Sequence, residues 1–183
     1  MKKYNFLIIF LFFTQLSIAQ LKVGDKIPNI IIRDYIKNEP PDKKLEGKYI
    51  LLEFWATWCE QCLKELPKIN SLAEKYSNRD DVIFISITDE SPKKARTVFK
   101  KHNFSSIVVC DDTSEIHKIF IWNDAEGSYS IPKTILIDPK GIIKWKGSTM
   151  KLNPELFAKF LSQENITTAD ETPFDIPSPT FTK

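Results

Sequence analysis

The cysteine pair in Trp58-Cys59-Glu60-Gln61-Cys62 is the feature that most constrains this chain. It directly follows the apolar run Tyr49–Trp55, which is typical of a buried strand, and it precedes a long amphipathic segment. Cysteines three residues apart at the start of a helix lie on one face, where their sulfurs can bond and separate. The sequence therefore predicts a redox-active dithiol where a strand turns into a helix.

The two cysteines are expected to have different roles. Cys59 falls at the predicted helix start, where unpaired N–H groups and the helix dipole stabilise a thiolate. Cys62 begins a stripe of helical spacing that continues through Leu66, Ile69, Ala73 and Tyr76. We therefore expect Cys59 to face solvent and attack, and Cys62 to face inward and resolve.

A lone CxxC also occurs as half of a zinc site, which usually needs four ligands. The remaining candidates are Cys110, His102 and His117, and they form no second ligand pair. The sequence thus favours redox chemistry over metal binding or an inert structural disulfide, and it predicts neither a metal nor a cofactor. We interpret Cys110 as a buried, unreactive thiol and the two histidines as surface helix residues.

The N-terminus has the pattern of a secretory signal. Lys2-Lys3 precede the apolar run Phe6–Phe13, and Ser17-Ile18-Ala19 supplies small residues for cleavage. The run is too short to cross a bilayer, which takes about 20 residues. We expect a signal peptide over residues 1–19 and an exported, periplasmic or otherwise extracytoplasmic protein with no stable membrane insertion after cleavage. An uncleaved anchor is the alternative.

The charge balance argues against polyanionic partners. The chain holds 26 Lys+Arg and 24 Asp+Glu, and removing Lys2 and Lys3 with the signal leaves 24 of each. A neutral mature chain gives no electrostatic reason to expect nucleic acid or a membrane surface as partner.

The remaining sequence alternates between strand-like and helix-like segments, which is typical of a single α/β domain over residues 20–163. Beyond that point the chain loses its periodicity, so residues 164–183 are expected to form a flexible tail. The expected strands are Tyr49–Trp55, Val82–Thr88, Ser106–Cys110, Thr134–Ile137 and Ile142–Trp145, and the expected helices are Glu60–Tyr76, Pro92–Lys101, Ser114–Phe120 and Pro154–Ser162.

The segment Glu53–Pro67 resembles the active-site segment of thioredoxin-fold proteins, and it is most similar to exported TlpA/ResA-like thiol-disulfide oxidoreductases. Val23–Pro28 resembles the opening segment of that family. Ile131–Thr134, followed by Ile137–Gly141, resembles its cis-proline strand and hairpin. The resemblance covers residues 21 to 163 and implies a thioredoxin fold, with a central mixed sheet flanked by helices and an N-terminal extension.

The resemblance also assigns two acidic residues to the site. Glu53 interrupts the apolar strand at the position where thioredoxin holds a buried carboxylate that moves protons to and from the resolving thiol. Burial would raise the pKa of such a group, whereas an outward-facing Glu53 would simply be solvated. Glu90 stands where ResA-like proteins carry a glutamate near their cysteines, so it would tune the thiols or select clients. A solvated loop acid is the alternative, and Asp89 competes for the same role.

Client docking is assigned in the same way. Pro132 resembles the family's cis-proline, which presents the preceding backbone, here Ile131, for strand-like pairing with an extended client. Trp58 is expected to shape that docking surface. The anion of Glu60, between the cysteines, should disfavour the Cys59 thiolate and so predicts a reducing protein.

The resulting hypothesis is an exported thiol-disulfide oxidoreductase that reduces client disulfides. The resemblance implies thiol-bearing client proteins, such as those of cytochrome c maturation, and recycling by a membrane thiol reductase of the CcdA/DsbD type. Two alternatives remain open. A peroxiredoxin-like peroxidase needs Thr-x-x-Cys, which Thr57-Trp58-Cys59 does not supply. A Sco-like copper-binding protein prefers CxxxC with a distal histidine, although a soft CxxC can also bind Cu(I).

Overall fold

A six-stranded mixed sheet forms the centre of the protein in the computed structural model, which describes residues 21–121 and 130–171. The strand order is β1-β4-β3-β2-β5-β6. Strands β2, β3 and β4 run parallel, whereas β1, β5 and β6 are antiparallel to their neighbours. The strands are β1 (Asp34–Lys37), β2 (Tyr49–Phe54), β3 (Val82–Thr88), β4 (Ile107–Cys110), β5 (Lys133–Ile137) and β6 (Ile143–Ser148).

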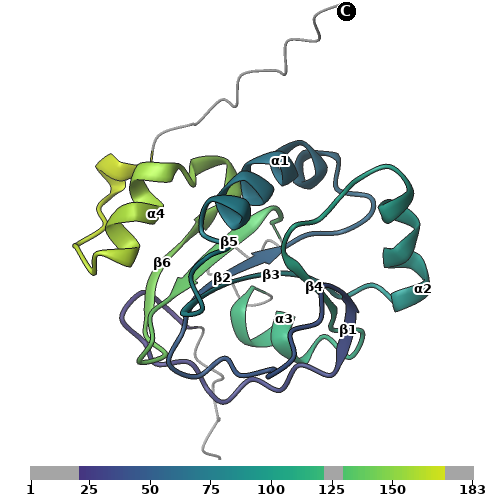
Figure 1. Ribbon diagram of the computed structural model, residues 1–183, viewed down its shortest axis with the longest axis horizontal. Coiled ribbons are helices and arrows are strands. Elements are labelled where there is room, and N and C mark those ends of the chain that lie inside the picture. Colours follow the sequence, from purple (N-terminus) through teal and green to yellow (C-terminus); the bar gives the residue numbers. More distant parts are fainter. Residues whose placement is uncertain (1–20, 122–129, 172–183) are drawn as a thin grey trace, which may run out of the picture.

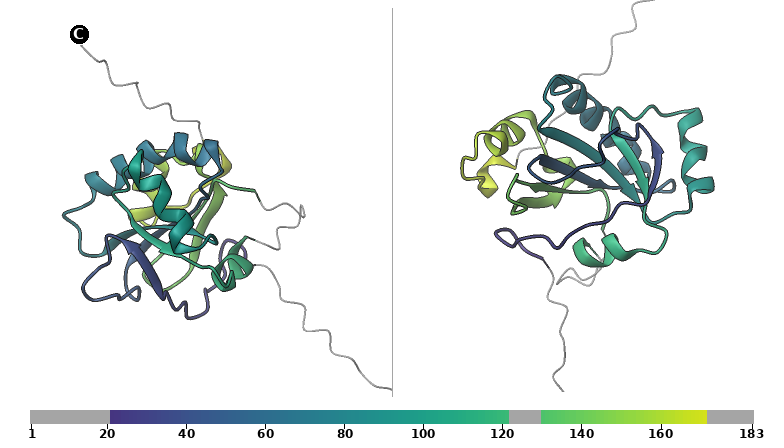
Figure 2. Two further views of the ribbon diagram at one scale, coloured as in Figure 1. Left: turned by 90° about the vertical axis from the view of Figure 1, so that its right-hand side faces the viewer. Right: turned by 60° about the horizontal axis from the view of Figure 1, so that its bottom comes forward.

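Helices cover both faces of this sheet. Helices α1 and α4 lie on one face and α3 lies on the other (Figure 1), and the rotated views show the same arrangement (Figure 2). The predicted α/β thioredoxin fold is confirmed. The helices are α1 (Glu60–Lys75), α2 (Pro92–Ala95), α3 (Glu115–Phe120) and α4 (Pro154–Leu161), with 3-10 turns η1 (Arg96–Lys100), η2 (Thr149–Lys151) and η3 (Thr168–Asp170).

Strand β2 is buried along its whole length because a core lies on each side of it. Leu51 packs with side chains of α1 and α4, including Ile69 and Phe157. Leu52 and Phe54 point the other way, into a second core that α3 closes. Burial on both faces explains why this strand is an almost continuous apolar run, and it leaves the carboxyl of Glu53 inside the protein.

Two elements differ from the sequence expectations by more than a shift of their bounds. The helix expected over Pro92–Lys101 is α-helical only to Ala95 and continues as the 3-10 turn η1. Strand β1 was not predicted, because it is a four-residue edge strand with no clear alternation.

The described chain continues past the domain boundary predicted at residue 163. Trp145 Nε1 donates to Glu171 at 3.1 Å, and Lys151 forms an ion pair with the same carboxylate at 2.7 Å. The predicted signal peptide and residues 172–183 lie outside the described residues. Within 21–121 and 130–171, no helix has both the length and the apolar character needed to cross a membrane.

Candidate functional site: a disulfide at the start of helix α1

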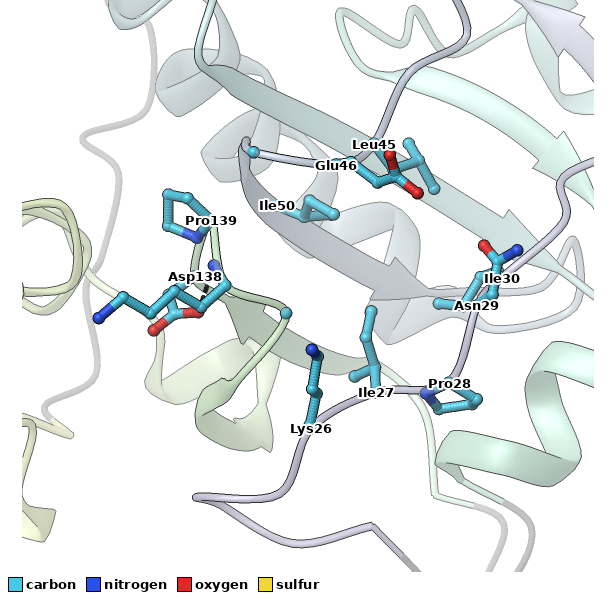
Figure 3. Close-up of a pocket in the computed structure, with 13 residues that line it drawn as sticks. Lys26, Ile27, Pro28, Asn29, Ile30, Leu45, Glu46, Ile50, Asp138 and Pro139 are labelled. Carbon is cyan, nitrogen blue, oxygen red and sulfur yellow. Dashed lines mark hydrogen bonds between the residues drawn. The ribbon is translucent and has the colours of Figure 1, made fainter.

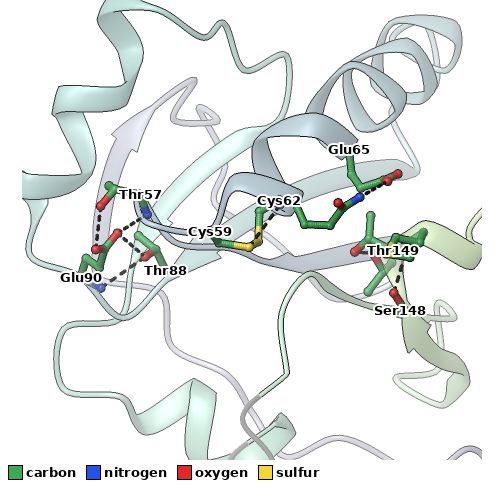
Figure 4. Close-up of a disulfide and its surroundings, with 11 residues drawn as sticks. Thr57, Cys59, Cys62, Glu65, Thr88, Glu90, Ser148 and Thr149 are labelled. Atoms are coloured by element: carbon green, nitrogen blue, oxygen red, sulfur yellow. Dashed lines mark hydrogen bonds between the residues drawn. A yellow bond between two sulfur atoms is a disulfide. The ribbon is translucent and has the colours of Figure 1, made fainter. Parts of the chain in front are cut away.

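Cys59 and Cys62 form a disulfide at the end of β2, with the two Cα atoms 5.3 Å apart (Figure 4). Cys59 is the N-cap residue of α1, and the Cys62 N–H donates to its Sγ at 3.1 Å. When the disulfide opens, this N–H and the positive end of the helix dipole favour negative charge on the Cys59 sulfur. The fold therefore gives Cys59 the environment of an attacking thiolate.

The prediction that Cys59 faces solvent is wrong for this oxidised form. Cys59 is 6% exposed and Cys62 is 2% exposed, because both lie in one apolar cluster with Trp55 and Leu66. Trp58 stands outside that cluster and is 63% exposed. A reacting partner therefore meets only a small part of the Cys59 sulfur, next to an exposed indole.

Glu53 is buried in the middle of the sheet, 2% exposed, between Ser86 of β3 and Thr134 of β5. Its Oε2 has no hydrogen-bond partner among the described residues. Burial raises the pKa of Glu53 to about 8; the Ser86 hydroxyl offsets part of this rise, and the nearby Glu65 carboxylate adds to it. The expected burial and raised pKa are present, so the carboxyl is mostly protonated near neutral pH. Its role in proton transfer stays a prediction.

Two charged residues that the sequence analysis did not single out follow the cysteines along α1. Glu65 accepts a hydrogen bond from Gln61 Nε2 at 2.9 Å and pairs with Lys68 Nζ at 2.7 Å. Lys68 is buried, 3% exposed, although it is charged. Glu65 lies three residues beyond Cys62 and Lys68 lies three residues beyond Glu65, and this helical spacing was the available signal. Charged residues on a helix usually face water, so this spacing alone does not indicate that the two side chains are buried.

Glu90 anchors the loop that precedes Cys59 (Figure 4). Its carboxylate accepts the Thr57 N–H at 2.6 Å and the Thr57 hydroxyl at 2.8 Å, and it pairs with Lys94 at 2.6 Å. Burial alone would raise the pKa of Glu90, but these bonds from Lys94 and Thr57 outweigh it and lower the pKa. None of the bonds reaches a cysteine. The structure thus makes Glu90 an ionised support for the Thr57 backbone, and its influence on the thiols stays a prediction.

Glu90→Gln should destabilise the protein by about 1–3 kcal/mol, because an amide loses the Lys94 ion pair and turns a donor toward one of the Thr57 donors. Denaturant unfolding at neutral pH measures this loss. Glu115→Gln is the matched control, since Glu115 forms an exposed ion pair with Arg33 and should lose less than about 1 kcal/mol. Equal losses in both variants would contradict an anchoring role.

The Ile131–Pro132 peptide bond is cis, as the resemblance implied. The Pro132 carbonyl accepts the Thr149 N–H at 3.2 Å, which ties this segment to η2. Ile131 is partly buried and packs between the α3-side core and the apolar cluster around the cysteines. Client docking at Ile131, Pro132 and Trp58 stays a prediction.

Cys110 belongs to the same apolar cluster as the two disulfide cysteines, and both histidines depart from their predicted surface positions on helices. His117 was predicted at the surface and is fully buried instead, because α3 turns it against Phe54 and its Nδ1 contacts Asp111 Oδ2 at 2.7 Å. His102 is half-buried and lies after η1 rather than in a helix. Across the described part of the chain, no group of three or more His, Cys, Asp or Glu side chains could hold a metal ion.

Cys110 should resist alkylation in the folded protein. It is 5% exposed at the end of β4, and burial raises the pKa of its thiol to about 12, so almost no thiolate is present at neutral pH. Mass spectrometry after iodoacetamide treatment of the reduced protein should show modification at Cys59 and none at Cys110. Labelling of Cys110 before unfolding would show that this thiol is accessible.

A cavity of about 340 Å³ lies away from the disulfide, beside the turn between β5 and β6 (Figure 3). Ile50, at the start of β2, lines it, whereas the disulfide follows the end of that strand. Lys26, Glu46 and Lys140 supply charged groups to its wall, but it contains no cysteine or histidine. The cavity is therefore separate from the redox site.

A disulfide at the end of the central strand, in a sheet with helices on both faces, places the protein among the thioredoxin-like thiol-disulfide oxidoreductases. A family model described as "AhpC/TSA family" matches residues 23–146. The chain therefore belongs to the AhpC/TSA family, and within it to the ResA-like thiol-disulfide oxidoreductases.

Three relatives illustrate this membership. The thiol-disulfide oxidoreductase ResA of Bacillus thuringiensis subsp. konkukian is 30% identical over 142 residues, covering 76% of this chain and 79% of its own. The thiol:disulfide interchange protein DsbE of Haemophilus influenzae is 27% identical over 157 residues, and the match covers 76% of this chain and 82% of DsbE. The solution structure of a Bacteroides thetaiotaomicron protein, described provisionally as a protein disulfide isomerase, is similar with a TM-score of 0.63 and 27% sequence identity. The match covers 78% of this chain and 87% of that chain.

Proposed function

We propose that this protein works outside the cytoplasm as a reductase of disulfides in client proteins. The observation that carries the proposal is the Cys59–Cys62 disulfide at the start of α1, with the buried carboxyl of Glu53 in the preceding strand β2 and Glu65 three residues beyond Cys62. The signal-like pattern of residues 1–19 supports export, and so do the names of the relatives, ResA and DsbE.

The reaction has two exchange steps. The Cys59 thiolate attacks a client disulfide, the client S–S bond breaks, and one client sulfur leaves as a thiolate that takes up a proton. Cys62 then gives its proton to Glu53, in the minority of molecules whose Glu53 is ionised at neutral pH, and attacks Cys59 Sγ. The bond between Cys59 and the client breaks, and the second client sulfur leaves. Two electrons have passed to the client, and the Cys59–Cys62 disulfide has formed.

The burial of Cys62 favours the reducing direction, and it opposes the stabilisation of the Cys59 thiolate by the start of α1. Burial, which raises the pKa of Glu53, also disfavours negative charge on Cys62, because that side chain is only 2% exposed. Thiols whose thiolates are poorly stabilised form disulfides that are hard to reduce. Glu60 contributes little to this effect, because it is exposed, pairs with Lys64 at 2.8 Å and is screened by water.

Clients are proposed to dock across Trp58, Ile131 and Pro132, with the backbone of Ile131 pairing with an extended client segment. Trp58 and Met150 are exposed and offer apolar contacts to such a segment. In an oxidising compartment the Cys59–Cys62 disulfide needs an electron donor, for which we propose a membrane thiol reductase of the CcdA/DsbD type. Apocytochrome c and other exported thiol proteins are the proposed clients.

The reduction potential of the Cys59–Cys62 couple tests the direction. Equilibration in defined dithiothreitol or glutathione buffers, followed by alkylation and mass analysis, should give a value near or below about −270 mV. A value near about −120 mV would make the protein an oxidant and overturn the proposal. Cys110→Ala, which removes the remaining thiol, should leave the potential unchanged.

A further inference from the structure

Lys68 is a buried cation on the active-site helix, and the reaction as described so far does not use it. Its ammonium donates to the carbonyls of Thr149 at 3.2 Å and Met150 at 3.3 Å, and it pairs with Glu65 at 2.7 Å. An ammonium has three hydrogens, so these acceptors satisfy all of its donors. A buried charge with a complete set of partners is costly to assemble and needs a specific explanation.

The partners of Lys68 connect the two halves of the site. On one side, Glu65 accepts a hydrogen bond from Gln61, which lies between the two cysteines. On the other side, Thr149 donates its N–H to the Pro132 carbonyl and its hydroxyl bonds to Thr134, the cross-strand neighbour of Glu53. A continuous polar chain therefore runs from the CxxC helix through Lys68 to the Pro132 segment.

We propose that Lys68 is a positioning residue for thiol-disulfide exchange: it fixes Glu65 between the CxxC helix and the Pro132 segment, and its charge sets the pH at which Cys62 resolves the mixed disulfide. The proposal rests on the exchange chemistry of the Cys59–Cys62 pair and not on its direction.

The charges around Glu53 explain the expected effect. The charged group of α1 that acts on Glu53 is Glu65, and Lys68 pairs with it. Cys59, Cys62 and, from β4, the buried thiol of Cys110 lie in one apolar cluster, and the disulfide cysteines titrate only after reduction. The neighbours of Glu53 on β3 and β5, Ser86 and Thr134, do not titrate. With Lys68 present, the Glu65–Lys68 pair carries no net charge. Removing only the cation leaves the site negative, and removing only the carboxylate leaves it positive.

A charge cycle tests the proposal in the purified, reduced protein. Stopped-flow reaction with dithiobis(nitrobenzoic acid) releases thionitrobenzoate in two phases, and the second phase reports attack by Cys62. The midpoint of its pH dependence should rise by about one unit in Lys68→Met and fall by about one unit in Glu65→Gln. In the double variant, which restores neutrality, the midpoint should return close to that of the wild type.

Lys75→Met is the matched control, because Lys75 lies exposed in the last turn of the same helix and should leave the midpoint unchanged. If Lys68→Met does not fold, the loss of Lys68 can be tested by comparing the double variant with Glu65→Gln. The midpoint of the second phase should then be about one pH unit higher in the double variant. Coincident midpoints in all folded variants would overturn the proposal, even if their rates fell. An oxidising potential with the midpoint order intact would overturn only the proposed reductase direction.

Discussion

Cys59→Ser should abolish thiol-disulfide exchange, lowering turnover of a disulfide substrate such as insulin by several orders of magnitude. Serine keeps the size of the side chain but supplies no thiolate, and its hydroxyl does not attack a disulfide at neutral pH. The place of Cys59 at the start of α1, where the Cys62 N–H points at its sulfur, supports this role. Insulin turbidity with dithiothreitol as electron donor measures the loss.

Cys62→Ser should stop the reaction halfway rather than prevent it. Cys59 still attacks the client, but no second thiol releases it, so a mixed disulfide accumulates. The covalent complex should appear on non-reducing gels and disappear on reduction, and mass spectrometry should place the link at Cys59. Cys110→Ala should turn over at the wild-type rate, since Cys110 is buried at the end of β4. A complex linked through Cys110, or full activity in Cys59→Ser, would contradict the assignment.

The redox centre was predictable because its signals are local. The apolar run before Cys59 and the helical stripe after it are contiguous in sequence, and they mark the strand-to-helix turn where the disulfide lies. The acid that interrupts this run at Glu53 was visible for the same reason. Strand β2 must be apolar to be buried on both faces, so an acid within it is conspicuous.

Other features depend on contacts between distant segments. Lys68 reads as an ordinary surface lysine, and its burial follows from carbonyls 81 and 82 residues further along the chain. The burial of Cys59 likewise depends on the apolar cluster that includes Trp55. His117 occupies one of the few turns of α3, which is too short for its periodicity to show which side faces the sheet. No sequence window contains this information.

Glu53→Gln should change both the stability and the pH profile of the protein. The pKa of Glu53 is about 8 in the folded state against an ordinary value of 4.5 for an exposed glutamate, so the folded state keeps a proton that the unfolded chain releases. The contribution of Glu53 to stability is therefore greatest below pH 4.5, the pKa in the unfolded chain. It falls as the pH rises from there to the folded-state pKa of about 8, and it stays at its lowest level at higher pH. The loss is on the order of a few kcal/mol.

Glutamine has the same shape and no proton to lose, so the variant should lack this decline and be more stable than the wild type at about pH 9. Thermal melts across the pH range measure the difference. Glu155→Gln, at an exposed position of α4, is the control and should keep the wild-type slope.

The same substitution separates proton transfer from simple burial. Glu53→Gln removes the proton acceptor that we propose for Cys62, so the resolving step should slow by roughly a hundredfold and lose its titration near pH 8. The first attack by Cys59 should keep its rate, because the helix N-terminus supplies the stabilisation of that thiolate. If both steps slowed equally, the defect would lie in packing. A resolving step with its wild-type pH dependence would place the acceptor elsewhere, with Glu65 the nearest remaining carboxylate on the helix that carries Cys62.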